Sequence, residues 1–397
     1  MTLIAPFRAI MPPPAQAQSV AAPPYDVLSS AEARLRAAGN PLSFLHVSKP
    51  EIDLPEGVAA DDPAVYAKAA ENMARLKIEG AIGLTEGAHL YVYRAETGGR
   101  RQTGIAGAAP IEAYRDGRIR RHELTRTAKV MDRARQIEAV GAHTGPVMLS
   151  HRDDAAVAEA VAAIAAEAPT LEAEVDGVRH SVWMADGDAG VALVEAVRRL
   201  DTLYVADGHH RSEAATRVSG ASFLVVAFPE SEMRILDYNR VVRDLGGRSP
   251  DAFLAALGGA FAVSPSESPV RPDRPARFGL YLEARWYGLT LKSAPAENGD
   301  PTAALDAEIL SRTVLAPLLG IEDVRNDPRI DFVGGSRGLD GLAARVDSGG
   351  MAAAFALYPV SLRQLFAVAD AGRVMPPKST WFEPKLADGL LSLPLDG

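Results

Sequence analysis

The side chains that most clearly support chemistry lie at five consecutive positions, Asp207, Gly208, His209, His210 and Arg211. A carboxylate can act as a base or bind Mg²⁺, histidine donates protons near neutral pH, and arginine binds phosphate through paired hydrogen bonds. A helix cap and a turn would explain Asp207 and Gly208, but they would not require two histidines and an arginine. We therefore expect Asp207, His209 and His210 to be catalytic, with Asp207 also a candidate ligand of Mg²⁺. Gly208 and Arg211 are expected to bind phosphate.

The elements around this turn are those that usually position a ligand. An apolar strand is expected over residues 202–206, and a short helix is expected over residues 211–219. Ligands of α/β proteins gather at the carboxyl ends of strands, and the N–H groups at the start of a helix attract anions. The strand–turn–helix order therefore predicts an anion-binding site.

A cationic segment lies earlier in the chain. Residues 118–135 contain seven basic and two acidic side chains, which gives +5 in a chain whose net charge is −9. An expected helix over residues 122–142 would place the side chains at positions 122, 126, 129 and 133 on one face. Such a stripe can bind nucleotide phosphates, although it can also be ordinary solvated surface. The candidates are His122, Lys129 and Arg133 for phosphate binding and Glu123 for catalysis.

Two segments near the N-terminus supply candidates for substrate binding. In residues 21–27 (AAPPYDV) two prolines fix the backbone before Tyr25 and Asp26. Residues 40–47 (NPLSFLHV) present His46 within a largely apolar stretch. Each of these three side chains can bind substrate, but each can also serve as a cap, a turn residue or part of the packing.

A further phosphate-binding candidate, Lys378, lies near the C-terminus. In residues 375–385 (MPPKSTWFEPK) the Lys-Ser-Thr step is similar to the end of a Walker A motif, but the glycines of that motif are absent. The segment is therefore no P-loop. Lys378 can still bind an anion, and the alternative is a surface strap that is packed by its two aromatic residues.

Other catalytic patterns are missing from the sequence. The segment HELTR at residues 122–126 has arginine where a zinc protease needs its second histidine. Neither a GxGxxG fingerprint nor a GxSxG nucleophile turn occurs. A metalloprotease, a Rossmann-type dinucleotide site and a serine-triad hydrolase therefore have no support.

The composition limits the class of protein. Of 397 residues, 47% are apolar, 42 are Lys or Arg, 51 are Asp or Glu, and none is cysteine. The missing cysteine excludes disulfides and thiolate chemistry and fits a reducing compartment, and the net acidity weighs against a nucleic-acid platform. Neither a signal peptide nor an apolar run of ~18 residues is found. We therefore expect a cytoplasmic protein without a membrane span.

The expected elements mix strands, hairpins and helices. Hairpins are expected over residues 89–109 and 278–291, strands over 222–228, 235–242 and 351–360, and helices over 155–168, 303–319 and 361–371. This mixture predicts the α/β (α+β) class, with a mixed sheet that contains hairpins.

A Pro-rich, charged stretch at residues 265–277 is the best candidate for a linker, or else it is a loop. It would separate a main α/β domain, residues 1–264, from a C-terminal α/β part, residues 278–397. The first of these carries the DGHHR turn. The second is either a separate domain or integrated with the first.

The sequence resembles two known groups of proteins. The turn and its flanking elements are similar to the phosphate-site motif of the ParB/sulfiredoxin superfamily, which includes ParB-like nucleotide-binding proteins, sulfiredoxins and archaeal free serine kinases. Nearly the whole chain resembles the bacterial family called domain of unknown function 1015. That resemblance is carried by PFRA at 6–9, VAAPPYDV at 20–27, NPLSFLHVSKP at 40–50, HELT at 122–125, ADGHHR at 206–211 and MPPKSTWFEPK at 375–385.

The resemblance implies a nucleotide-dependent phosphotransferase with ATP or ADP and Mg²⁺, acting on a small hydroxylated metabolite as a free L-serine kinase does. A phosphoserine phosphatase would need much the same site. The other alternative is a non-catalytic, ParB-like nucleotide-binding regulator, but the sequence shows no helix-turn-helix with a basic recognition helix. Because sulfiredoxin chemistry needs a thiol, that activity is excluded.

Overall fold

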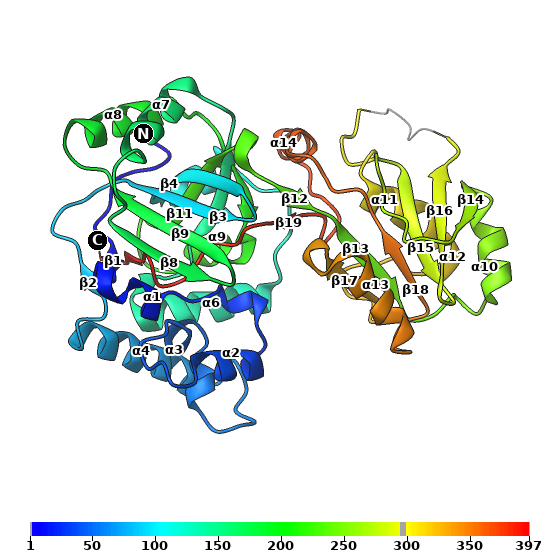
Figure 1. The fold of residues 1–397 in the computed structure, drawn as a ribbon, viewed down its shortest axis with the longest axis horizontal. Helices are drawn as coiled ribbons and strands as arrows, with labels where there is room; N and C mark the ends of the chain where they lie inside the picture. Colours follow the sequence, from blue (N-terminus) through cyan, green and yellow to red (C-terminus); the bar gives the residue numbers. More distant parts are fainter. Residues whose placement is uncertain (1, 294–298, 397) are drawn as a thin grey trace. The chain divides into compact units, whose positions relative to one another are not determined.

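The computed structural model describes residues 2–293 and 299–396, which form two compact units. The first unit comprises Met1–Arg121, Thr125–Met233 and Pro384–Gly397, and the second comprises His122–Leu124 and Arg234–Glu383. Both units combine a sheet with helices (Figure 1). The chain therefore leaves the first unit near Met233 and returns to it for its last residues.

The first unit is built on an eight-stranded sheet in the order β5-β10-β7-β11-β4-β3-β9-β8. Its strands are β3 (Tyr91–Thr97), β4 (Arg100–Pro110), β5 (Ile119–Arg120), β7 (Val147–His151), β8 (Leu171–Val175), β9 (Val178–Met184), β10 (Leu203–Asp207) and β11 (Ser222–Pro229). The pairs β7–β11 and β5–β10 are parallel and the other neighbours are antiparallel. The expected hairpin at residues 89–109 is β3–β4, which turns through Gly98 and Gly99 at positive φ.

Helices pack on both sides of this sheet. On one face, α7 (Ala155–Ile164) and α8 (Gly187–Val197) cover alternate strand residues such as Leu149 and Val225 (Figure 1). On the other side lie α2 (Ser30–Ala37), α3 (Leu45–Ser48), α4 (Pro63–Ile78) and α6 (Thr127–Val140). The helices α2, α3 and α4 form an apolar cluster of their own, which includes the last residue of α6.

Short elements complete the first unit. They are β1 (Ile10–Met11), α1 (Ala17–Val20), β2 (Gly83–Leu84), α5 (Ile111–Arg115), β6 (Ala142–His143), α9 (His209–Ala215) and β20 (Leu393–Pro394), with 3-10 turns at Pro14–Gln16, Tyr25–Val27, Pro50–Asp53 and Glu230–Glu232. The pair β6–β20 and an isolated bridge between Ala22 and Asp388 tie the C-terminal segment to this unit.

The second unit contains a six-stranded antiparallel sheet in the order β14-β16-β15-β18-β13-β17. Its strands are β13 (Tyr238–Val242), β14 (Phe261–Ser266), β15 (Arg277–Leu282), β16 (Arg285–Leu291), β17 (Ile330–Gly334) and β18 (Ala353–Ala356). Successive residues point to opposite faces, as a pleated strand requires. Thus Val242 and Phe355 belong to one apolar cluster, whereas Val241 and Ala354 belong to another.

Each face of the second sheet has its own helices. The first cluster includes residues of α10 (Pro250–Leu257), α11 (Asp306–Leu310) and α12 (Ala316–Leu319), and the second includes residues of α13 (Gly338–Asp347). The unit also contains a two-stranded ladder of β12 (Ile235–Leu236) with β19 (Trp381–Phe382), a 3-10 turn at Gly335–Arg337 and α14 (Leu362–Asp370). Ser361 caps α14 with a reciprocal capping box.

The two mixed α/β units confirm the predicted fold class. Three expected boundaries nevertheless differ in the structure. Residues 267–276 form a loop between β14 and β15, which is the second of the two alternatives for the stretch 265–277, and the two compact units divide near residue 233. The helix that was expected at residues 303–319 starts at Asp306 and includes a π-helical turn at Ser311–Leu315.

The third boundary concerns the cationic segment. The helix α6 begins at Thr127, so His122 does not share a helical face with Lys129 and Arg133. His122 precedes this helix, and its backbone carbonyl oxygen accepts a hydrogen bond from the Met375 amide at 2.7 Å. Within the described ranges, no helix is both long and apolar enough to span a bilayer.

Candidate functional site

The connection between β10 and α9 is shorter than expected, because Asp207 ends the strand and His209, His210 and Arg211 already belong to the helix. The strand ends at Asp207, Gly208 has φ 94°, and the helix begins at His209. A Cβ atom at Gly208 would lie only 3.0 Å from Nε of Arg211. Glycine is therefore required here for its positive φ and for the space that the guanidinium occupies.

Arg211 is held in place by two of its guanidinium nitrogens, while the third has no hydrogen-bond partner among the described residues. Its side chain is buried, with a residue exposure of 8%. Nη2 donates to Oδ2 of Asp207 at 2.8 Å, and Nη1 donates to the carbonyl oxygen of Pro146. Nε has no hydrogen-bond partner within the described chain. A buried donor without a partner costs free energy, so this group is a natural contact for a bound anion.

Asp207 lies between two cations. Lys385 approaches its Oδ1 at 3.4 Å, and Arg211 binds its Oδ2. Burial favours the neutral acid, but Lys385 and Arg211 hold the pKa of this carboxyl far below its usual range. Burial similarly opposes the charge of Arg211, but Asp207 raises the pKa of the guanidinium. Asp207 and Arg211 therefore stay ionised at any pH near neutrality.

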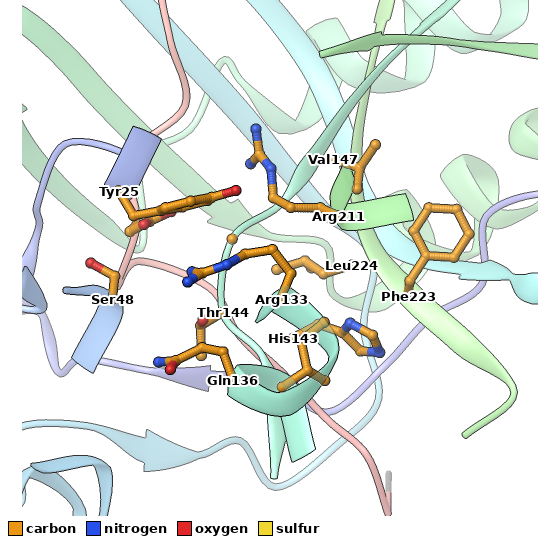
Figure 2. Close-up of a pocket in the computed structure, with 13 residues that line it drawn as sticks. Tyr25, Ser48, Arg133, Gln136, His143, Thr144, Val147, Arg211, Phe223 and Leu224 are labelled. Carbon is orange, nitrogen blue, oxygen red and sulfur yellow. The ribbon is translucent and has the colours of Figure 1, made fainter. Parts of the chain in front are cut away.

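A cavity lies beside this network (Figure 2). Its walls come from the 3-10 turn at Tyr25–Val27 and from the helices α3, α6 and α9. The strand β6, the starts of β7 and β11 and the C-terminal segment complete them. The lining residues are Tyr25, Ser48, Arg133, Gln136, Ile137, His143, Thr144, Gly145, Val147, Arg211, Phe223, Leu224 and Asp388. Two arginines and several hydroxyl, amide and carboxyl groups thus meet in a space that is otherwise apolar.

Tyr25 and Arg133, two of the predicted residues, lie in this cavity together with Arg211. The guanidinium carbon of Arg133 stacks 4.1 Å from the ring centre of Tyr25, and Nη2 donates to Asp132 at 2.7 Å. Burial, and then the neighbouring Asp26, raise the pKa of the Tyr25 hydroxyl, which stays neutral. One predicted substrate-binding residue, Tyr25, and two predicted phosphate-binding residues, Arg133 and Arg211, therefore meet here.

The two histidines of the turn face different surroundings. His210 accepts a hydrogen bond at Nε2 from the Arg126 amide at 3.1 Å, which fixes the start of α6. His209 is buried, and α9 packs against α6 through Val130, Ala134, Ile137 and Ala214. The packing of α6 on α9 is what brings Arg133 to the turn.

Several other predicted residues lie outside the cavity. Lys129 is exposed on α6. His46 forms a separate network in which its Nδ1 lies 2.9 Å from a carboxylate oxygen of Asp53. His122, Glu123 and Lys378 belong to the second unit, where Lys378 adopts φ 56° with its ammonium 5.7 Å from the ring of Tyr238.

Asp388 is a site residue that sequence reasoning missed. It is 1% exposed, it lines the cavity, and its Oδ1 has no hydrogen-bond partner among the residues described. Burial raises the pKa of this carboxyl to about 7, although Arg211 acts in the opposite direction. The available signal was a lone acid in the apolar run LADGLLSL at residues 386–393.

The donor atoms at the turn do not fit a protein-held Mg²⁺. Both oxygens of Asp207 face cations, and a divalent ion there would be repelled by Lys385 and Arg211. No cluster of three or more His, Asp or Glu side chains suited to a metal occurs in the described part of the chain. The role of Asp207 is therefore better described as holding the two cations.

Comparisons with known proteins identify the family. Residues 4–308 match the model of the family described as protein of unknown function (DUF1015), so the chain belongs to that family. A search of curated proteins found no match.

Solved structures with a similar trace share little sequence with this chain. A conserved hypothetical protein from Pyrococcus furiosus is 12% identical with a TM-score of 0.37, and the match covers 74% of this chain and 96% of that one. A free serine kinase in complex with AMP is 10% identical with a TM-score of 0.39, covering 74% and 91%. C-terminally truncated SbnI from Staphylococcus aureus is 12% identical with a TM-score of 0.39, covering 73% and 88%. At these TM-scores the similarities carry no argument about activity.

Proposed function

We propose that this member of the DUF1015 family is a phosphotransferase, which moves a phosphoryl group from ATP or ADP to the hydroxyl of a small metabolite. Free L-serine is the acceptor that the sequence resemblance favours. The observation that carries the proposal is the buried guanidinium of Arg211, which is anchored by Asp207 and keeps Nε without a partner at a cavity that Arg133 also lines.

The chemistry of phosphoryl transfer matches such a site. The reaction needs positioning and charge neutralisation more than covalent help from the protein. Two arginines from separate elements can bind the phosphate oxygens of the donor from two directions. Asp207 contributes by preventing Arg211 from turning away, since it holds Nη2 at 2.8 Å.

The other predicted residues have supporting parts in this proposal. Tyr25 supplies a neutral hydroxyl at the wall of the cavity, where the acceptor would bind. His209 begins the same helix as Arg211, and its charge is a further contribution that lowers the pKa of Asp207. Mg²⁺ would enter as part of the nucleotide complex and not through a protein-held site.

The test is a product assay with the full-length chain. Purified protein is incubated with L-serine and with ATP or ADP in the presence of Mg²⁺, and phosphoserine is measured by mass spectrometry. We expect phosphoserine to accumulate with the wild type and to fall at least about 100-fold with Arg211→Lys, which cannot bind both Asp207 and a phosphate. Equal product from both proteins, or none from the wild type with serine and a panel of other hydroxylated metabolites, would contradict the proposal.

A further inference from the structure

Two carboxylates flank Arg211, and their surroundings differ. Asp207 has a cation at each oxygen, with Arg211 at 2.8 Å and Lys385 at 3.4 Å. Asp388 is buried in the wall of the cavity, and its Oδ1 has no hydrogen-bond partner within the described residues. A carboxylate with a vacant lone pair at a cavity can accept a proton, whereas one bound by two cations is a poor base.

The backbone fixes the position of Asp388. Its amide donates to the carbonyl oxygen of Ala22 at 2.9 Å, and its carbonyl oxygen accepts from the Ala22 amide at 3.1 Å. The Tyr25 amide is hydrogen-bonded to its carboxylate. Gly389 follows with φ 88°, and a Cβ atom there would lie 2.8 Å from Cβ of Phe44. The fold thus holds this carboxylate between the Tyr25 segment and Arg211.

The surroundings of Asp388 affect the pKa of its carboxyl in opposite directions. Arg211 and Arg133 favour the carboxylate, Asp26 opposes it, and burial is the largest effect, so the pKa rises to about 7. Burial lowers the pKa of His143 in the same cavity to about 4, so this imidazole is neutral near pH 7. Asp388 therefore changes charge in a pH range where His143 is already neutral.

We propose that Asp388 is the proton acceptor of the site, which takes the proton from the acceptor hydroxyl, while Asp207 is a permanent anion that positions Arg211 and Lys385. This inference rests on the proposed phosphotransferase function. It gives the C-terminal segment, which returns to the first unit after residue 383, a catalytic residue.

The step balances as follows. The acceptor oxygen forms a bond to the terminal phosphorus of the nucleotide as its O–H bond breaks, and the proton moves to Oδ1 of Asp388. The bond between that phosphorus and the bridging oxygen breaks, and its electron pair leaves with the shortened nucleotide. Asp388 then releases the proton to water, so no other reactant is required.

The first test compares Asp388→Asn, which keeps the shape of the side chain but cannot accept a proton, with wild type. We expect the plateau kcat to fall by about 100-fold or more, with the KM for the nucleotide at pH 6 changed less than about threefold. The wild-type kcat should rise with pH to a plateau above about pH 7, and that rise should be lost in the variant. A kcat within a few-fold of wild type at every pH would overturn the inference.

A matched variant separates the two carboxylates. Asp207→Asn should raise the KM for the nucleotide, because Arg211 loses its anchor, and it should keep the rise of kcat near pH 7. Thermal unfolding checks that each variant is folded. If Asp388→Asn does not fold, Asp388→Glu replaces it, and we expect a reduced kcat that still rises with pH. Loss of that rise in Asp207→Asn, with its retention in Asp388→Asn, would reverse the assignment.

A binding measurement tests Asp388 without turnover. The affinity for ADP is measured by calorimetry at pH 6 and at pH 8. At pH 6 we expect wild type and Asp388→Asn to bind ADP equally tightly. At pH 8 the ionised carboxylate of the wild type repels the phosphates, so the variant should bind about tenfold more tightly. The protonation of ADP itself also changes with pH, but it does so equally for both proteins and does not affect their comparison at one pH. Equal affinities at both pH values would overturn the inference alone, whereas no ADP binding by wild type would overturn the proposed function and the inference with it.

Discussion

Each unit of the protein buries an arginine, and the two arginines have different partners. Arg211 in the first unit is paired with Asp207 and keeps Nε without a partner beside a cavity. Arg240 in the second unit is 1% exposed and donates to the carbonyl oxygens of Tyr238 and Pro377. The first guanidinium has a donor left for a ligand, while the second joins two segments of its own unit.

The electrostatics of the two arginines differ in the same way. Burial lowers the pKa of Arg240 to about 10, because its contacts are carbonyl oxygens and the ring of Phe332, 5.2 Å away. Burial also opposes the charge of Arg211, but Asp207 and Asp26 raise the pKa of that guanidinium. A buried arginine that is held by carboxylates is already compensated and can accept a second anion. One that is held by carbonyl oxygens is structural.

Replacing Arg211 should have the largest effect. Arg211→Lys retains the charge but loses the planar group that spans Asp207 and a phosphate, so we expect kcat/KM to fall by about 10²–10³-fold. The measurement is steady-state kinetics with ATP and serine. An effect below about fivefold would mean that Arg211 is structural, as Arg240 is.

Removing the anchor should change the response to acid. Because the pKa of Asp207 is lowered in the folded state, this group stabilises the fold above about pH 4 and loses that contribution as the pH falls. Asp207→Asn should therefore lose less unfolding free energy than wild type between pH 6 and pH 3, as measured by urea titration. Parallel losses in both proteins would show that the ion network does not stabilise the fold.

Replacing the second arginine should affect stability alone. Arg240→Met leaves two buried carbonyl oxygens without their donor, so we expect the unfolding free energy to fall by about 2 kcal/mol. The affinity for ADP, measured by calorimetry on the folded variant, should stay within about twofold of wild type. A larger loss of ADP binding would abolish the distinction between the two arginines.

Removing a helix cap in the second unit should have the smallest effect of these changes. Ser361 accepts a hydrogen bond from the Gln364 amide at the start of α14, and Ser361→Ala should lower the unfolding free energy by about 1 kcal/mol. Thermal unfolding measures this loss, and kinetics should be unchanged. A change in kcat would show that the second unit takes part in the reaction, which would contradict a purely structural role for that unit's Arg240.

Local sequence signals predicted most of the elements. The hairpins β3–β4 and β15–β16 and the strand β10 are all set by residues close together in the chain. Boundaries that depend on distant partners were harder to predict. The start of α6 is fixed by His210, 84 residues away, and no local pattern reports that contact.

The candidate site shows the same limit. Arg211, Arg133 and Tyr25 were identified from residue type and resemblance, and the structure brings them to one cavity. Asp388 and the salt bridge from Lys385 to Asp207 depend on the return of the C-terminal segment to the first unit. That return joins residues 178 positions apart, and composition or periodicity cannot report it.

The most direct test of the central claim is an experimental structure of the full chain with ADP. We predict that the terminal phosphate lies within hydrogen-bond distance of Nε of Arg211, with Arg133 on the same phosphate group and Asp207 still paired with Nη2. Nucleotide density at another place, with the Arg211 cavity unchanged, would contradict the claim that this turn binds phosphate.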